Sequence, residues 1–442
     1  MERILHPQAE PLPKNDGLDR THTTASSYTA SSLPLGREIV FVAVVCCAQL
    51  TTQAGLGQSL SIAHVIGRSY GVARPEDLAW FLAAYSLTVG TFILVSGRLG
   101  DLYGHKRMLV VGYVWFGVWS IVTGLAVYSD VVMFDICRAL QGIGPSILLP
   151  NGLAILGSTR IDIVGALIGI ISLLLINVAW NQAPVAGWQE PYVYILLIIG
   201  VLLISAFLYV ELRVAKFPLL PLDALESSDI GFVLGCLACG WGSFGVWFYY
   251  LWQFYLELRG ASPLLATAWI CPVAVSGAMA AVATGFLLSR MGPAWTMVAA
   301  MSAFFTGITL IATMPIDQTY WAQAFVCVLV ITWGMDMSFP AATVILSNAV
   351  RKRHQGVAMS LVNTVVNYSI SLALGFASTA EVQVNPGGTS KESMLAGYRA
   401  ALYVGMGLAG TGWLLSLVYL LPFPSLRSRR KSRSPRGDDQ AA

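Results

Sequence analysis

The chain has 442 residues, of which 56% are hydrophobic and only 11% are charged, and its net charge is +3. Soluble domains carry about 25% charged residues, so this composition excludes a soluble fold for the body of the chain. It also excludes disorder, a coiled coil and nucleic-acid binding. Apolar runs of about 20 residues recur, which is the length that crosses a bilayer core and not the short alternation of a β-barrel.

These runs predict an all-α membrane protein with about twelve transmembrane helices. The predicted spans are 38–63, 77–97, 108–128, 131–156, 162–180, 191–212, 229–256, 264–288, 295–313, 321–347, 356–381 and 398–421. They divide the chain into a disordered cytoplasmic tail (1–37), an N-terminal half with helices 1–4 (38–156), helices 5–6 with a cytoplasmic loop (157–228), a C-terminal half with helices 7–12 (229–421) and a basic cytoplasmic tail (422–442).

The positions of the basic residues predict the orientation. With a cytoplasmic N-terminus, most of the 26 Lys and Arg residues fall in segments on the inner side. Such segments carry an excess of Lys and Arg in membrane proteins. Both termini are therefore expected in the cytoplasm, and the basic tail that ends the chain is expected to contact membrane lipid.

An internal repeat relates the two halves. The same residue types recur 188 or 190 positions apart in corresponding spans, as Gly97, Leu99 and Gly104 with Gly285, Leu287 and Gly292, and as Gly144 and Pro150 with Gly334 and Pro340. Two pseudo-symmetric halves are typical of secondary transporters, which bind substrate between them near mid-membrane.

Two motifs carry a resemblance to a known family. The stretch Gly97–Arg107 resembles the loop 2–3 signature of the major facilitator superfamily, and Arg138-x-x-Gln141-Gly142-x-Gly144 resembles its fourth-helix signature. The stretches 180–185, 334–342 and 347–350 are similar to the fungal fourteen-span drug:H⁺ antiporters of the aminotriazole-resistance type. The resemblance implies a proton-coupled exporter of drugs, toxins or metabolites that works by alternating access.

The chain departs from that family in two ways. The Gly-rich antiporter signature of helix 5 is missing, and only residues 157–161 separate helix 4 from a segment that resembles the family's extra linker pair. The chain therefore resembles a fourteen-span transporter that lacks two helices. An ordinary twelve-span transporter is the competing interpretation. The first span also contains no acidic residue beyond its cytoplasmic start, where many proton antiporters carry a carboxylate.

The loop between the second and third spans is a candidate conformational latch. Its glycines, Gly97 and Gly104, permit tight turning and close helix approach. By resemblance, Asp101 closes the cytoplasmic side together with Lys106 and Arg107. A simple topological anchor is the alternative for the two basic residues.

Three charged residues inside predicted spans are candidates for proton coupling. A buried membrane charge needs a partner or a water-filled cavity, and is often functional. Arg138 is the only basic residue deep in a span, and Asp135 lies three residues earlier, on the same side of a helix. Asp336 lies between two methionines in an apolar helix. The alternative is a structural role for each of them.

Polar and aromatic residues inside spans are candidates for the substrate cavity. Gln49 and Gln53 supply the polar content of the first span, Gln141 follows Arg138, and Trp247 lies in an aromatic seventh span. Asn363 and Asn367 follow each other at four-residue spacing on one helix face.

The sequence thus predicts a secondary transporter that exports a small-molecule substrate in exchange for protons. It is expected to be a monomer in the plasma membrane rather than the vacuolar membrane, and neither an enzyme nor dependent on a cofactor or a metal. Two alternatives remain open. One is a carrier of small inorganic or ammonium-like solutes, in either direction, and the other is a truncated membrane protein that no longer transports.

Overall fold

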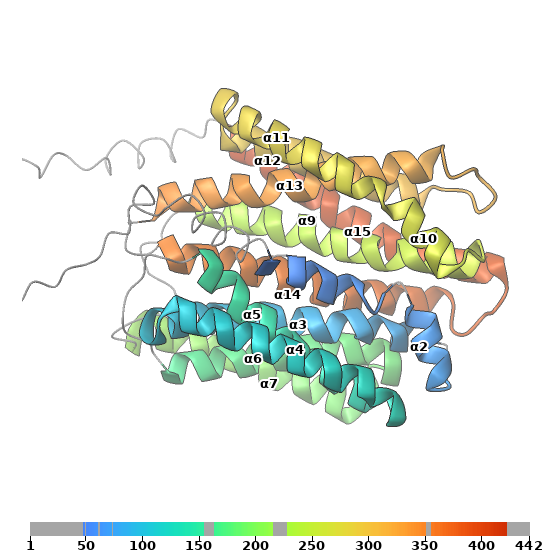
Figure 1. Ribbon diagram of the computed structural model, residues 1–442, viewed down its shortest axis with the longest axis horizontal. Coiled ribbons are helices and arrows are strands. Elements are labelled where there is room, and N and C mark those ends of the chain that lie inside the picture. The colour runs from blue at the N-terminus through green and yellow to red at the C-terminus, as the bar shows by residue number, and fades with distance from the viewer. Residues whose placement is uncertain are drawn as a thin grey trace, which may run out of the picture. The chain divides into compact units, whose positions relative to one another are not determined.

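Membrane-length helices make up nearly all of the described chain (Figure 1). The computed structural model describes residues 47–48, 50–60, 62–72, 74–153, 163–214, 228–350 and 355–421. These residues all belong to the unit formed by residues 45–442. The prediction of an all-α membrane protein is confirmed.

The first part of the bundle contains six labelled α-helices. Of the first predicted span, residues 38–46, 49 and 61 lie outside the described residues, and residues 50–57 are helical. The helices that follow are α2 (Ala63–Ser69), α3 (Pro75–Tyr103), α4 (His105–Leu125) with the 3₁₀ turn η2 (Ala126–Tyr128), α5 (Val131–Leu153), α6 (Ile163–Ala186) and α7 (Pro191–Tyr209), which the π turn η3 (Val210–Val214) extends.

The second part of the bundle follows the same plan. Its elements are α9 (Ser228–Gln253) with the π turn η4 (Phe254–Leu258), α10 (Pro263–Ile270), α11 (Pro272–Arg290), α12 (Pro293–Ala312), α13 (Gln323–Ala349), α14 (Gln355–Val384) and α15 (Lys391–Leu420).

Eleven segments in the described part of the chain are long and apolar enough to cross a membrane. They correspond to the predicted spans two to twelve. The eighth span differs from the prediction because it is interrupted at Cys271, between α10 and α11. Pro272 follows directly, and a proline ring removes a helical hydrogen bond and clashes with the carbonyl four residues earlier.

The repeat seen in the sequence has a matching backbone geometry. Gly104 separates α3 from α4 with a φ of 92°, and its counterpart Gly292 separates α11 from α12 with a φ of 82°. These left-handed conformations favour glycine, which has no Cβ. The two glycines therefore turn corresponding helices in the same way, and the 188-residue correspondence holds in three dimensions.

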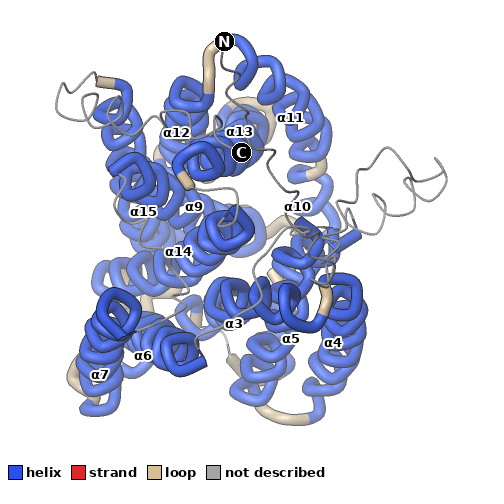
Figure 2. Tube along the Cα trace, turned by 90° about the vertical axis from the view of Figure 1, so that its left-hand side faces the viewer, coloured by secondary structure: helices blue, strands red, loops and turns tan. Residues whose placement is uncertain are grey.

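The helices pack as two groups that meet along one main seam. In the second group, α9 packs against α14 and α15, and α12 packs against α13 and α15. In the first group, α5 packs against α3 and α4. The seam between the groups is the contact of α3 with α14, and α6 packs beside it with α7 behind (Figure 2).

Candidate functional site

A cavity of about 450 Å³ lies between the two groups of helices. This volume falls in the usual range for small-molecule sites. Its walls come from the first helix and α5 on one side and from α9, α11, α13 and α14 on the other. The lining residues are Thr52, Gln53, Leu56, Leu149, Trp241, Ala281, Thr284, Gly285, Leu288, Met335, Asp336, Phe339, Pro340, Asn363, Val366, Asn367 and Ile370.

Among the described residues that line the cavity, one is acidic: Asp336 on α13. It is half-buried, and no Lys, Arg or His of the described chain lies within ion-pair distance of it. A Cβ on Gly277 of α11 would lie 3.0 Å from its Oδ2 atom, so α11 passes close to the carboxyl group. Asp336 can therefore hold either a proton or a cationic group, but not both at once.

Three amides predicted to be in the cavity do line it: Gln53, Asn363 and Asn367. The Asn363 Nδ2 atom donates to the Met359 carbonyl at 3.0 Å, and the Asn367 Nδ2 atom donates to the Asn363 carbonyl at 3.0 Å. One N–H of each amide group is thus engaged with its own helix, which leaves the second N–H as a donor and the oxygen as an acceptor. Gln49, the other amide predicted for the cavity from the first span, lies outside the described residues.

The tryptophan that lines the cavity is Trp241, not Trp247. Trp241 donates to the Ser338 hydroxyl at 3.1 Å, which fixes its ring against α13. Trp247 is buried among second-group helices, where its Nε1 atom donates to Cys327 Sγ at 2.9 Å. The two residues are six positions apart, so helical geometry points them in different directions. The sequence pattern could not distinguish them.

Arg138 is fully buried and holds the first group together. Its Nη2 atom donates to the Gly55 carbonyl at 2.8 Å, and its Nε atom donates to the Phe81 carbonyl at 3.1 Å. Its Nη1 atom donates to Gln141 Oε1 at 2.5 Å, and the guanidinium lies over the Tyr85 ring at 4.7 Å. The guanidinium thus connects the first helix and α3 through their backbone carbonyls, and α5 through the side-chain oxygen of Gln141.

Asp135 and Gln141 flank this arginine but do not line the cavity. No ion pair joins Asp135 to Arg138 in the part of the chain that the structure describes, and Asp135 Oδ1 is buried with no hydrogen bond. Gln141 is buried and donates to the Ser120 hydroxyl at 2.7 Å. Of the three proton-coupling candidates, Asp336 is the one that the described lining of the cavity includes, and Asp135 and Arg138 lie apart from it on α5.

The candidate latch lies at the α3–α4 turn. Gly97 is buried against α14, where a Cβ would lie 2.7 Å from Ser360 Oγ. Lys106 and Arg107 are exposed at the start of α4. The side chain of Asp101 lies outside the described residues, so its part in the latch stays a prediction. The interaction that the sequence did not indicate here is between His105 Nδ1 and Asn151 Oδ1, at 2.8 Å.

An ionic contact joins the two groups at the opposite end of the bundle. His64 Nδ1 of α2 lies 3.0 Å from Glu257 Oε1 of η4, and His64 Nε2 contacts Gln253 Oε1. The sequence analysis did not single out these residues. In the sequence they are a histidine and a glutamate near the ends of predicted spans, and such residues are too common there to indicate a contact. The contact holds the groups together at this end, while the cavity lies toward the α3–α4 turn.

A second buried acid also escaped the sequence analysis. Glu381 of α14 is 2% exposed and accepts a hydrogen bond from the Tyr250 hydroxyl at 2.7 Å. The Tyr398 ring packs tilted against the Tyr250 ring, with 5.6 Å between centroids. An acid at the end of an apolar span is usually taken as exposed, so hydropathy could not reveal that this one is enclosed. It lies outside the cavity.

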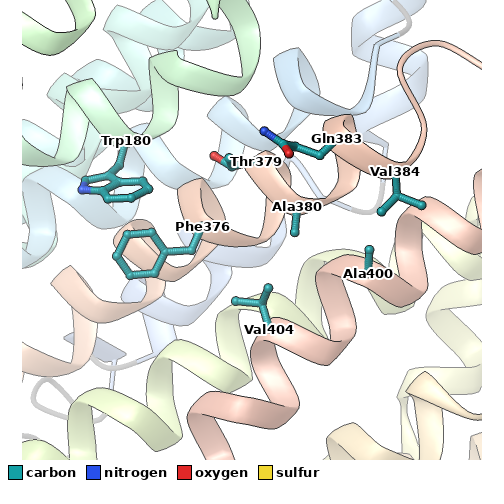
Figure 3. Close-up of a pocket in the computed structure, with 8 residues that line it drawn as sticks. All are labelled: Trp180, Phe376, Thr379, Ala380, Gln383, Val384, Ala400 and Val404. Carbon is teal, nitrogen blue, oxygen red and sulfur yellow. The ribbon is translucent and has the colours of Figure 1, made fainter. Parts of the chain in front are cut away.

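A larger hollow, about 710 Å³, lies on another side of the bundle (Figure 3). Residues of α6, α14 and α15 line it, and it is open rather than enclosed by helices. The Trp180 and Phe376 rings meet edge to face at its wall, with 4.4 Å between centroids. None of the described residues that line it is charged, which suits lipid chains better than selective binding of a solute.

These features define a class of protein. Two repeated groups of membrane helices enclose a polar-and-apolar cavity with one carboxyl group, and this is the architecture of secondary transporters. The family model of the Major Facilitator Superfamily matches residues 42–374. The chain belongs to this superfamily, as its two sequence motifs predicted, and it is a transporter relative rather than an enzyme.

Curated fungal transporters are similar over most of the chain. The low affinity ammonium transporter of Saccharomyces cerevisiae is 47% identical, over 86% of this chain and 88% of that protein. The efflux pump terJ of Aspergillus terreus is 44% identical, over 88% and 89%. The aminotriazole resistance protein of S. cerevisiae is 33% identical, over 87% and 84%.

A solved structure shares the fold. The bacterial homologue of the human lysosomal transporter Spinster, in an inward-facing and occupied conformation, matches with a TM-score of 0.58 and 12% identity, over 88% of this chain and 98% of that one. This likeness shows the fold alone.

Each alignment with a curated relative has more positions than the number of residues that this chain contributes to it. The alignment with the ammonium transporter has 459 positions, but 86% of 442 residues is only about 380, so about 79 positions hold a residue in the relative alone. The alignment with terJ has 464 positions and covers 88% of this chain, so about 75 positions hold a residue in terJ alone. The alignment with the aminotriazole resistance protein has 460 positions and covers 87% of this chain, which also leaves about 75.

Proposed function

We propose that the chain is a proton-coupled exporter of small organic compounds in the plasma membrane, with both termini in the cytoplasm. The observation that carries this proposal is the single carboxyl group of Asp336 in a cavity shared by both groups of helices. The relatives named as an efflux pump and as a resistance protein support the direction and the class of substrate.

The cavity suits a flat or cationic organic molecule. Trp241, Phe339 and Met335 offer apolar and aromatic surface, and an aromatic face attracts a cation. The oxygens of Asn363 and Asn367 accept hydrogen bonds from such a molecule. Asp336 binds the cation when ionised and releases it when protonated, so proton and substrate exclude each other at one group. An exchanger requires that its two ligands compete for one site. The proton and the substrate can then each shift the equilibrium between the inward-facing and outward-facing states.

A binding measurement tests this coupling. The purified chain in detergent is mixed with ethidium as a probe cation, and proton release is followed with a pH dye in weak buffer. The chain should release a proton on binding, and Asp336→Asn should abolish the release. Asp317→Asn, the same change in the loop between α12 and α13, is the matched control and should release protons normally. If Asp336→Asn releases as many protons as the unchanged chain, the proposed coupling is wrong.

A carrier of ammonium-like cations is the second candidate, because the relative with 47% identity is named a low affinity ammonium transporter. Such a cation would use Asp336 and the Trp241 face and leave most of the 450 Å³ empty. Competition distinguishes the two. Methylammonium at millimolar concentration displaces ethidium if the small cation is the substrate, and leaves it bound if the site selects larger molecules.

A further inference from the structure

The repeat allows the two groups to be compared helix by helix, beginning with α3 and α11. On α3, Gly90 and Gly97 let α14 approach closely: a Cβ would lie 2.5 Å from Tyr368 N at the first position and 2.7 Å from Ser360 Oγ at the second. The counterparts 188 positions later are Ala278 and Gly285 on α11. Both are exposed, and a Cβ on Gly285 would meet no atom within 4 Å.

The exposed small residues of α11 form a continuous line. Ala274, Ala278, Ala281 and Gly285 are all exposed and follow one face of the helix, and we call them the α11 stripe. Small residues on a membrane helix allow another helix to pack closely. No helix from α3 to α7 packs extensively against α11 in the described part of the chain. The close packing that α14 gives to α3 thus has no counterpart on α11.

The outer helices α4 and α12 show the same difference. On α12, Ser302 accepts a hydrogen bond from Trp413 of α15 at 2.9 Å, and Phe305 stacks on the Trp413 ring. Their counterparts on α4 are Val114, which is 60% exposed, and Gly117, where a Cβ would meet no atom within 4 Å. Half of the α12 span is buried, compared with 17% of the α4 span.

The pair α6–α7 does not occupy these places. The Asn181 Nδ2 atom of α6 donates to the Ser371 carbonyl of α14 at 3.2 Å, and the Ser371 hydroxyl donates to Asn177 Oδ1 at 2.9 Å. A Cβ on Gly375 would lie 2.8 Å from the Trp180 carbonyl oxygen, so α6 packs tightly on α14. Figure 2 shows α6 and α7 across the bundle from α11.

We infer that two faces, the α11 stripe of the second group and the α4 face of the first group (Val114, Gly117, Val118 and Ile121), are the docking surface for a pair of transmembrane helices that the relatives carry between α5 and α6 and this chain lacks. The pair is the counterpart of α14 and α15, with its first helix on the α11 stripe and its second on the α4 face. The α6–α7 pair is then additional and replaces neither helix.

The number of unmatched positions fits this occupant. The relatives hold about 75 to 79 residues that have no counterpart here. The helices α14 and α15 have 30 residues each, so two such helices and their connections fill that length. Two residues of the α11 stripe, Ala281 and Gly285, also line the cavity. A helix docked there would form a side wall of the cavity, which lipid cannot do selectively.

Cysteine labelling tests the docking surface and does not depend on the proposed function, since it measures no transport. Two chains are compared: the unchanged chain, and a chain into which the unmatched segment of the yeast ammonium transporter is inserted between α5 and α6. Each carries Cys47→Ser and Cys271→Ser, which remove the exposed cysteines of the described chain. Single cysteines at Ala278 and Val118 report on the two faces, and Leu202→Cys on α7, which is 64% exposed, is the matched control.

A membrane-soluble maleimide should label all three positions at similar rates in the unchanged chain. In the chain with the insertion, labelling at Ala278→Cys and Val118→Cys should fall by roughly tenfold or more, as expected for side chains moved into a packed interface. Labelling at Leu202→Cys should stay the same. Equal rates in both chains would overturn the inference. If the cysteine of Ala278→Cys is already protected from the maleimide without the insertion, and two copies of the chain crosslink through it, the two faces bind a second copy of the chain instead.

A second measurement applies if the chain with the insertion does not fold. The helix pair is expressed as a separate tagged fragment beside the unchanged full chain. It should co-purify with that chain, and Ala278→Trp should prevent co-purification while Leu202→Trp should leave it unaffected. Failure to co-purify, or co-purification insensitive to Ala278→Trp, contradicts the proposed docking surface.

Discussion

The two groups of helices share one repeat but differ in how completely they are packed. In the second group, α14 and α15 cover α9 and α12, and the buried core includes residues of α9, α12, α13, α14 and α15. The α4 face of the first group has no such cover, and neither does the α11 stripe of the second group. The comparison teaches that a repeat in sequence fixes where helices begin, turn and approach. It does not ensure that each place in the fold is filled by the next helix along the chain.

The difference also extends to what holds each group together. The first group depends on Arg138, whose counterpart 190 positions later is Val328, a fully buried apolar residue. A buried guanidinium joins backbone carbonyls of several helices at once, which a valine cannot do. The first group thus has a buried guanidinium at a position where the second group has an apolar side chain.

The largest effect is expected from Gly90→Val compared with Ala278→Val. A side chain at Gly90 collides with the Tyr368 backbone, which cannot move without shifting α14. We expect a loss of more than about 3 kcal/mol or a failure to fold, the upper range for overpacking. Ala278→Val should change little. Thermal unfolding in detergent gives both values, and similar losses for the two variants would break the comparison.

Arg138→Met should follow in size. The change leaves the Gly55 and Phe81 carbonyls without their donor in a buried site. Each unsatisfied buried group costs about 1–3 kcal/mol, so we expect a loss of roughly 2–4 kcal/mol. Arg68→Met, at an exposed position of α2, is the control and should be nearly neutral. If Arg138→Met unfolds at the temperature of the unchanged chain, the network is not what holds the first group.

Trp413→Ala should reduce stability by less, and the corresponding change in the first group, Val114→Ala, should have almost no effect. It removes the stack on Phe305 and the hydrogen bond to Ser302, and we expect a loss of about 1–3 kcal/mol for this half-buried side chain. Val114→Ala, at the counterpart of Ser302, should stay within about 0.5 kcal/mol because nothing packs on it. Insertion of the missing pair should make Val114→Ala costly, and no change on insertion would count against the correspondence of α4 with α12.

Glu257→Gln should have the smallest effect on stability. The contact with His64 is partly exposed, so solvent screening keeps its worth below about 1 kcal/mol. Its effect should appear instead in the distance between the groups, because the contact joins α2 to η4. Spin labels at Arg68 and Arg259 should show a broader, longer distance distribution in Glu257→Gln. An unchanged distribution would mean that the contact does not hold this end closed.

Much of the fold could be predicted because apolar length and proline or glycine placement determine membrane helices directly. Spans two to twelve, the turns at Gly104 and Gly292 and the two repeated groups all followed from the sequence. The break at Cys271 did not, because several other prolines lie inside unbroken helices: Pro145, Pro150, Pro184 and Pro340. Only packing decides which proline interrupts a helix.

The candidate site could be predicted less completely. Asp336, Gln53, Asn363 and Asn367 reached the cavity because a polar side chain in an apolar helix has few other places to go. Spacing alone puts Asp135 on the same side of its helix as Arg138, but the guanidinium donates to backbone carbonyls of other helices, which spacing cannot reveal. Contacts such as His64 with Glu257 join residues far apart in the chain, so no local pattern records them.

The most direct test of the account is where α6 packs in the membrane. With Cys47→Ser and Cys271→Ser as background, one chain carries cysteines at Asn177 and Ser371, whose side chains are 2.9 Å apart, and another carries them at Asn177 and Ala278 on α11. Oxidation should crosslink the first pair and not the second. Crosslinking of Asn177 to Ala278 would place α6 on the α11 stripe as a true fifth helix, and would contradict the claim that this place is empty.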